Sequence, residues 1–150
     1  MKNIKQENGR SMVEMLGVLA IIGVLSIGGI AGYTMAMNRY RANEIIDTAS
    51  KLSVVAQTAG ANGGTVKIPG WSDIGLSAIP HNAKINVCTN GQAKVTVEAT
   101  GVQNALSSIT GESYSSDIVV VKGSEGNSSC GNVAEDATAV TGGGSGGSEG

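Results

Sequence analysis

The most marked pattern in the chain is an apolar run from Met12 to Tyr33 that contains a single charged residue, Glu14. An α-helix of this length would extend about 33 Å, enough to cross a hydrocarbon core of about 30 Å. A secretory signal peptide is the alternative, but its apolar region is only about 7 to 15 residues long. The run therefore predicts a membrane-spanning helix over about 12–33.

Beyond Tyr33 the pattern becomes amphipathic, with apolar residues recurring every three to five positions opposite a polar face. The apolar set is Met37, Tyr40, Ile45, Ala49, Leu52 and Val55, and the polar set is Arg39, Arg41, Asn43, Asp47 and Lys51. Asp47 and Lys51 are four residues apart in the order that favours a helical ion pair. We expect the helix to continue over about 34–59 and to end near Gly60, where AGANGG supplies C-cap and loop residues.

In the C-terminal half, alternating apolar and polar positions over 83–87 and 93–99 predict a β-hairpin. A two-residue turn at Asn90-Gly91 would place the two apolar rows on opposite faces of the sheet. A three-residue loop over 89–91, with Gly91 left-handed, places them on one face. We therefore predict the longer loop, which pairs Val87 with Ala93 and Ile85 with Val95.

The remaining segments, 61–82 and 102–140, show weaker patterns. Residues 61–82 predict a connecting loop with one short turn, in which Trp71 caps the core or, alternatively, serves as a ligand platform. A short helix is expected over 102–110 with its end at Gly111, a buried strand over 117–122 and a weak strand over 133–140. The expected fold class is α+β, with a long N-terminal helix, transmembrane and then amphipathic, packed on a small antiparallel sheet.

Composition makes the core of this domain thin. Aromatic residues are 3% of the chain and Phe is absent, so Val, Ile, Leu and Ala must fill the core. Cys88 and Cys130 are the only cysteines, and their spacing of 42 residues fits neither a zinc site nor a redox motif. We expect a disulfide between them, worth about 4 kcal/mol by chain entropy, with two free thiols as the alternative.

The sequence encodes no recognisable catalytic or metal site. The single histidine, His81, has no cysteine or acidic cluster near it in sequence, and we expect a solvated loop residue. Four acids could approach one another, but they lack the spacing of a calcium-binding loop, so calcium binding stays an open alternative. They are Asp117, Glu125, Glu135 and Asp136. The net charge of −2 without a basic run indicates no intrinsic nucleic-acid binding. We expect a protein that is not an enzyme and has no cofactor.

The N-terminal segment carries a resemblance to a known family. It begins with Gly9, continues with a short polar step to Glu14, five residues after that glycine, and then becomes an unbroken apolar helix. This arrangement resembles the class III signal of type IV prepilins. The resemblance implies that prepilin peptidase cuts after Gly9, removing the basic leader MKNIKQENG, and that Arg10 becomes the N-methylated first residue. Arg10 departs from the family, in which that position is usually Phe, Met or Leu. The cysteine pair is likewise similar to the C-terminal disulfide loop of many type IV pilins.

The resemblance also gives Glu14 a partner. In the family this acid meets the N-terminal α-amine of a neighbouring subunit within the filament, whereas the residues alone leave open that Glu14 extends to the lipid headgroups. Four glycines of the run are expected to permit close helix packing or bending, although membrane helices tolerate glycine in general. They are Gly23, Gly28, Gly29 and Gly32.

The expected organisation is a leader over 1–9, a helix over 10–60, a globular head over 61–140 and a flexible or artificial Gly/Ser tail over 141–150. The order strand, strand, helix, strand resembles the type IVb class of pilins. The resemblance implies a major pilin that lies in the inner membrane of a Gram-negative bacterium and then assembles with its own copies, through the inner-membrane assembly machinery, into an extracellular pilus.

Two other interpretations stay open. One is a minor pilin or a type II secretion pseudopilin, which would share the N-terminal segment. The other is a membrane-anchored binding module that never polymerises. The sequence does not distinguish adhesion, conjugation, motility and DNA uptake as the role of the fibre.

Overall fold

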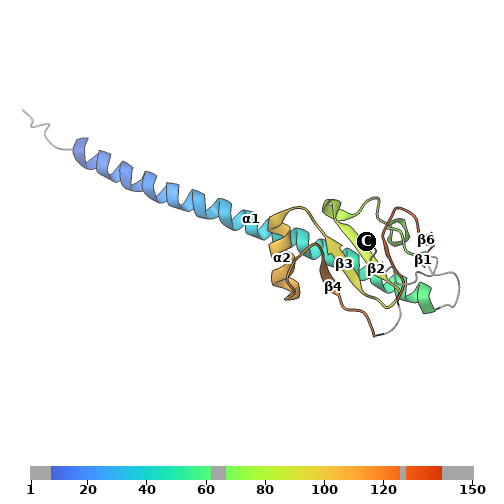
Figure 1. Cartoon of the computed structure of the whole chain (residues 1–150). Coiled ribbons are helices and arrows are strands. Elements are labelled where there is room, and N and C mark those ends of the chain that lie inside the picture. The colour runs from blue at the N-terminus through green and yellow to red at the C-terminus, as the bar shows by residue number, and fades with distance from the viewer. Residues whose placement is uncertain (1–7, 62–66, 126–127, 140–150) are drawn as a thin grey trace, which may run out of the picture. The chain divides into compact units, whose positions relative to one another are not determined.

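A computed structural model describes residues 8–61, 67–125 and 128–139. Most of the expected leader and the Gly/Ser tail lie outside these ranges. The chain divides into two compact units between Met37 and Asn38. Helix α1 (Asn8–Ala61) supplies the described part of the first unit and the opening segment of the second (Figure 1). Its end agrees with the predicted end near Gly60.

In the described part of the first unit, α1 is not covered by other segments of the chain. Every residue from 12 to 36 is exposed. Within the described residues, α1 is the one helix long and apolar enough to cross a membrane. This part of the sequence prediction is confirmed as far as length and composition go.

In the second unit, α1 buries a narrow stripe of residues at alternating spacings of three and four, as expected for a helix packed on one side. The fully buried members are Ala42, Ile45, Ala49, Leu52 and Ala56. The predicted apolar face of this helix includes Tyr40. This assignment is wrong, because Tyr40 is 63% exposed. It lies about 200° around the helix from Ala42 and thus faces away from the stripe. Three of the five members are alanines, because a short side chain brings the helix close to the sheet.

The stripe packs on a four-stranded antiparallel sheet in the order β4-β3-β2-β5, which confirms the α+β class (Figure 1). The strands are β2 (Lys84–Cys88), β3 (Ala93–Thr96), β4 (Ile118–Val121) and β5 (Cys130–Asn132). The predicted hairpin is confirmed in its register, because Val87 pairs with Ala93 and Ile85 with Val95. Gly91 has φ +85°, as the three-residue loop requires.

The predicted short helix is α2 (Thr100–Thr110), which begins two residues earlier than expected. It ends as predicted at Gly111, whose left-handed backbone (φ 74°) lets its N–H reach Ser107 O. Strand β4 lies within the predicted range, but only Ile118 of its four residues is buried. The predicted burial of this strand is therefore correct for one residue and too strong for the others.

Two connections differ from the prediction. The segment after α1 contains the short strand β1 (Lys67–Ile68) and two 3₁₀ turns, η1 (Ser72–Ile74) and η2 (Pro80–Asn82), rather than one turn. The weak strand predicted over 133–140 is confirmed for two residues only, β6 (Thr138–Ala139), while β5, which precedes this range, was not predicted. Strand β6 pairs with β1 in a second small sheet. Strand β5 has the sequence Cys-Gly-Asn, which shows no alternation to detect.

Candidate functional site

The predicted processing and assembly residues all lie on α1. Gly9 and Arg10 are in its first turns, and Glu14 follows one turn later with its side chain exposed. None of the four ion pairs found among the described residues includes Glu14. The ion pairs of the described residues therefore assign no partner to this carboxylate.

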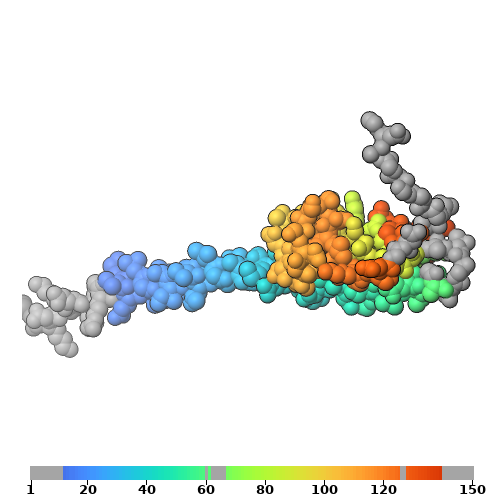
Figure 2. Space-filling model, turned by 60° about the horizontal axis from the view of Figure 1, so that its bottom comes forward, coloured from blue at the N-terminus to red at the C-terminus, as the bar shows by residue number. Residues whose placement is uncertain are grey.

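Around and beyond Glu14, α1 presents large apolar side chains on all sides. The fourteen members over 12–35 are between 52% and 74% exposed, and Figure 2 shows this stretch bare on the face in view. Moving one Leu, Ile, Val or Met side chain from water into apolar surroundings gains about 1.5–3 kcal/mol. Thirteen such side chains, together with Tyr33, make this stretch of α1 apolar enough to cross a membrane.

The four glycines singled out from sequence occupy open positions in the single chain. A Cβ atom at Gly23, Gly28, Gly29 or Gly32 would meet nothing within 4 Å, and all four are helical. Each glycine costs a helix about 1 kcal/mol relative to alanine. No contact within the described chain offsets that cost, so the proposed role in packing or bending stays a prediction about contacts with other molecules.

The predicted disulfide is present between Cys88 and Cys130. The two residues are directly opposite each other on β2 and β5, so the bond fastens an edge strand to the centre of the sheet. Cys88 is 1% exposed, whereas Cys130 is exposed. The bond therefore joins the buried core to the surface of the domain.

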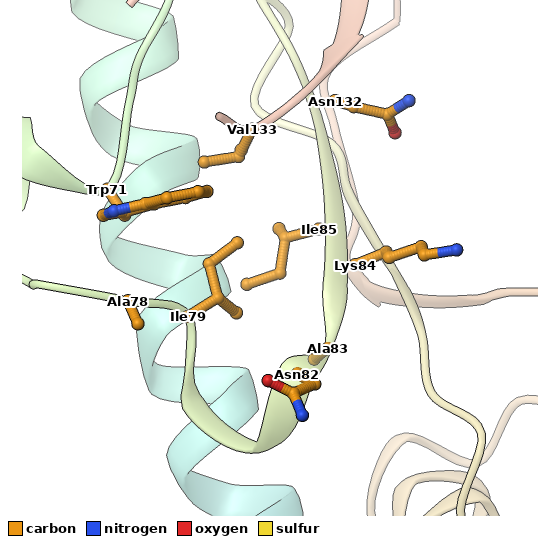
Figure 3. Close-up of a pocket in the computed structure, with 9 residues that line it drawn as sticks. All are labelled: Trp71, Ala78, Ile79, Asn82, Ala83, Lys84, Ile85, Asn132 and Val133. Atoms are coloured by element: carbon orange, nitrogen blue, oxygen red, sulfur yellow. The ribbon is translucent and has the colours of Figure 1, made fainter. Parts of the chain in front are cut away.

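Trp71 packs against the core, which agrees with its predicted role as a cap of the core. A slot of about 490 Å³ lies beside it. Figure 3 shows the side chains of Ile79 and Ile85 on the Trp71 side of β2, while those of Lys84 and Asn132 point away from Trp71. Polar groups thus do not converge on the indole, an arrangement that favours a core cap over a ligand platform.

The acidic residues do not form a metal site. Among the described residues there is no group of three or more His, Cys, Asp and Glu side chains arranged to hold a metal ion. Asp117 instead pairs with Lys94 at 3.6 Å, across the β3 and β4 strands. The predicted ion pair between Asp47 and Lys51 is confirmed at 2.6 Å.

His81 is exposed within the η2 turn, in agreement with its prediction as a solvated loop residue, and it also makes a contact that the sequence did not indicate. Its side chain is 33% exposed, and its Nε2 lies 2.9 Å from Glu44 Oε2 on α1. The two residues are 37 positions apart, and no local pattern could have connected them. The same turn borders a second cavity, of about 630 Å³, which sequence reasoning also missed.

The structure thus brings together the two cysteines, confirms the core role of Trp71 and leaves Glu14 and the glycines exposed on an apolar helix. The apolar helix is compatible with anchoring of the folded domain in a membrane. Comparisons with protein-family models, with curated proteins and with solved structures found no match.

Proposed function

We propose that this chain is the structural subunit of a type IV pilus, a major pilin that prepilin peptidase cuts after Gly9 and that assembles into a helical filament. The observation that carries the proposal is Glu14, an acid five residues after Gly9 at the start of a helix exposed throughout 12–36. A helix that served only as an anchor would have no use for this acid.

The proposal requires α1 to serve in two environments. In the bilayer, a carboxylate at the centre of a helix costs about 2.5–3.5 kcal/mol on insertion scales, and nearer the boundary it reaches the headgroups. In a bundle of copies, the apolar surfaces of 12–36 cover one another, and Glu14 meets the α-amine of Arg10 on a neighbouring copy. Removing one member of a buried ion pair costs about 3–5 kcal/mol, so assembly would depend on this acid.

The second unit supports the same proposal. Residues 38–139 contain a hydrophobic core and a disulfide, and disulfides persist in oxidising compartments outside the cytoplasm. A head exported from the cytoplasm on an apolar helix fits a protein held first in the inner membrane and then in an extracellular filament. Prepilin peptidase and the inner-membrane assembly machinery are the partners this route requires.

The test is expression in a bacterium that supplies a prepilin peptidase and a pilus assembly system. We expect sheared surface material to contain filaments whose subunit begins at Arg10 by mass spectrometry. Glu14→Ala should leave membrane insertion and cleavage intact and reduce filament yield at least tenfold. Glu125→Ala, which removes an exposed acid of the head, is the matched control and should leave the yield unchanged.

Two outcomes would contradict the proposal. A membrane-bound subunit that still begins at Met1 would exclude cleavage at Gly9. If the domain is exposed on the cell surface without forming filaments, and Glu14→Ala does not change this exposure, the helix is a permanent anchor for a binding module. If filaments form but this chain is only a trace component of them, the chain is a minor pilin, which the ratio of subunits in the sheared material measures directly.

A further inference from the structure

A second cavity of about 630 Å³ opens beside the η2 turn, within the second unit. Its walls come from the middle of α1, from η2 and the start of β2, and from the connection between β3 and α2. The residues that line it are Arg41, Ile45, His81, Asn82, Lys84, Val97, Glu98, Ala99 and Val102. Small-molecule sites in proteins generally have volumes of about 300–1,000 Å³, so the size is suitable for one small ligand.

The floor of this cavity is apolar and its rim is charged. Ile45, Val97 and Val102 are each at most 5% exposed and belong to the core. Two cations, Arg41 and Lys84, and one acid, Glu98, complete the lining. An apolar base with a few polar groups above it is the usual composition of a ligand site.

The charged groups of the rim are not used within the described part of the domain. The four ion pairs found there involve Asp47, His81, Lys94 and Lys122 with their partners, and none includes Arg41, Lys84 or Glu98. Arg41 is nevertheless half-buried. A guanidinium held partly out of water without a carboxylate partner favours the approach of an anion.

The turn that forms one wall has an uncommon backbone. His81 and Asn82 both have left-handed conformations, with φ values of 57° and 52°, although neither is glycine. Such conformations are uncommon outside glycine and occur disproportionately at functional sites. The hydrogen bond between His81 and Glu44 holds this turn against α1.

We propose that this cavity binds a small hydroxylated carboxylate of the size of a uronic acid. The Arg41 guanidinium provides a planar fork that matches a carboxylate, and Lys84 adds a second positive charge. Glu98 and the Asn82 amide oxygen accept hydrogen bonds from ligand hydroxyl groups. The apolar floor contacts the C–H face of the ligand. The same Glu98 carboxylate repels ligands with several negative charges.

The test is a titration of the ¹⁵N-labelled full chain in detergent micelles with D-glucuronate, D-glucose and inorganic phosphate, each alone. We expect saturable shifts of backbone amides only with glucuronate, centred on residues 41, 81–84 and 97–102. Arg41→Gln should weaken binding at least tenfold, a loss of about 1.4 kcal/mol. Arg39→Gln removes an exposed guanidinium that does not line the cavity and should leave affinity unchanged.

Lys84→Gln provides a second variant, since this exposed side chain can be replaced without disturbing the core, and it should weaken binding several-fold. The proposal is wrong if glucuronate gives no saturable shifts, if glucose or phosphate binds equally well, or if Arg39→Gln weakens binding as much as Arg41→Gln. It does not depend on filament assembly, because the titration is made on the unassembled chain.

Discussion

The hydroxyl group of Tyr114 makes two hydrogen bonds to a single residue, Val97. It accepts one from the Val97 N–H at 2.8 Å and donates one to the Val97 carbonyl oxygen at 2.9 Å. Val97 is 5% exposed and follows the last residue of β3, beyond the point where β4 pairs with that strand. Tyr114 thus supplies, with one atom, the pairing that a neighbouring strand would supply.

Tyr114→Phe should therefore destabilise the domain. The substitution keeps the ring but leaves the buried Val97 N–H without its partner, which costs about 1–3 kcal/mol. The Val97 carbonyl oxygen keeps its hydrogen bond from Gln103 Nε2 at 2.7 Å. The measurement is the free energy of unfolding of the full chain in detergent, from urea titration followed by circular dichroism. Tyr40→Phe is the matched control, because Tyr40 is 63% exposed. A loss below 0.5 kcal/mol for Tyr114→Phe would contradict the role assigned to the hydroxyl.

Removing the disulfide should have a larger effect. The bond closes a loop of 42 residues, which contributes about 4 kcal/mol on the chain-entropy model. We expect the double substitution Cys88→Ala and Cys130→Ala to lower the free energy of unfolding by about this amount. Reduction of the unaltered chain by dithiothreitol should have a similar effect and should not change the double variant further. Equal stability with and without the bond would show that the core suffices alone.

Gly70→Ala should disturb the contact between the loop after α1 and the C-terminal segment. A Cβ at Gly70 would lie 2.3 Å from the Glu135 carbonyl oxygen and 2.6 Å from the Asp136 carbonyl carbon, both backbone atoms. The segment must move, which costs about 1–3 kcal/mol as overpacking does, and should raise amide hydrogen exchange at Ser72, which donates to Glu135. Gly29→Ala, at an open helical position, should leave both the domain stability and this exchange unchanged.

The glycines of the apolar run give a prediction about assembly. Gly28→Leu combined with Gly32→Leu should leave the fold of the second unit intact, since apart from the adjoining helix backbone no described atom lies within 4 Å of either Cβ position. Filament yield should fall at least tenfold, because a small-xxx-small face lets helices approach closely and leucine prevents this. Ile27→Leu combined with Ile30→Leu preserves hydrophobicity and is the control. Normal filaments from the glycine variant would show that these glycines are merely tolerated in a membrane helix and do not mediate helix packing.

The hairpin was predictable because its information is local. A period of two along each strand and one glycine with positive φ determine both the register and the loop length. The buried stripe of α1 was predictable at Ile45, Ala49 and Leu52, and the prediction failed at its N-terminal end. Ala42 is too small to stand out in a hydrophobic pattern, whereas Tyr40 stands out and lies on the opposite face.

Strand β5 could not be found from its sequence. Its three residues show no alternation, and its position depends on the bond of Cys130 and on close approach at Gly131, where a Cβ would lie 2.8 Å from Ile68 Cγ1. The cavity beside η2 was equally hidden, since Arg41 and Lys84 are brought together by tertiary packing alone. Glu14 was recognisable from sequence because it is the one acid in an apolar run, but none of the ion pairs found among the described residues includes it.

The pairing of β1 with β6 has a consequence for the order of events during synthesis. Lys67 is opposite Ala139, so the first described strand after α1 lacks its paired strand until residue 139 has been added. Helix α1, by contrast, is complete once residue 61 has been added. The buried stripe of α1 is therefore uncovered while the head is synthesised, and insertion of 12–36 into a bilayer can precede closure of the domain. A chaperone that binds apolar helices could bind α1 during that interval.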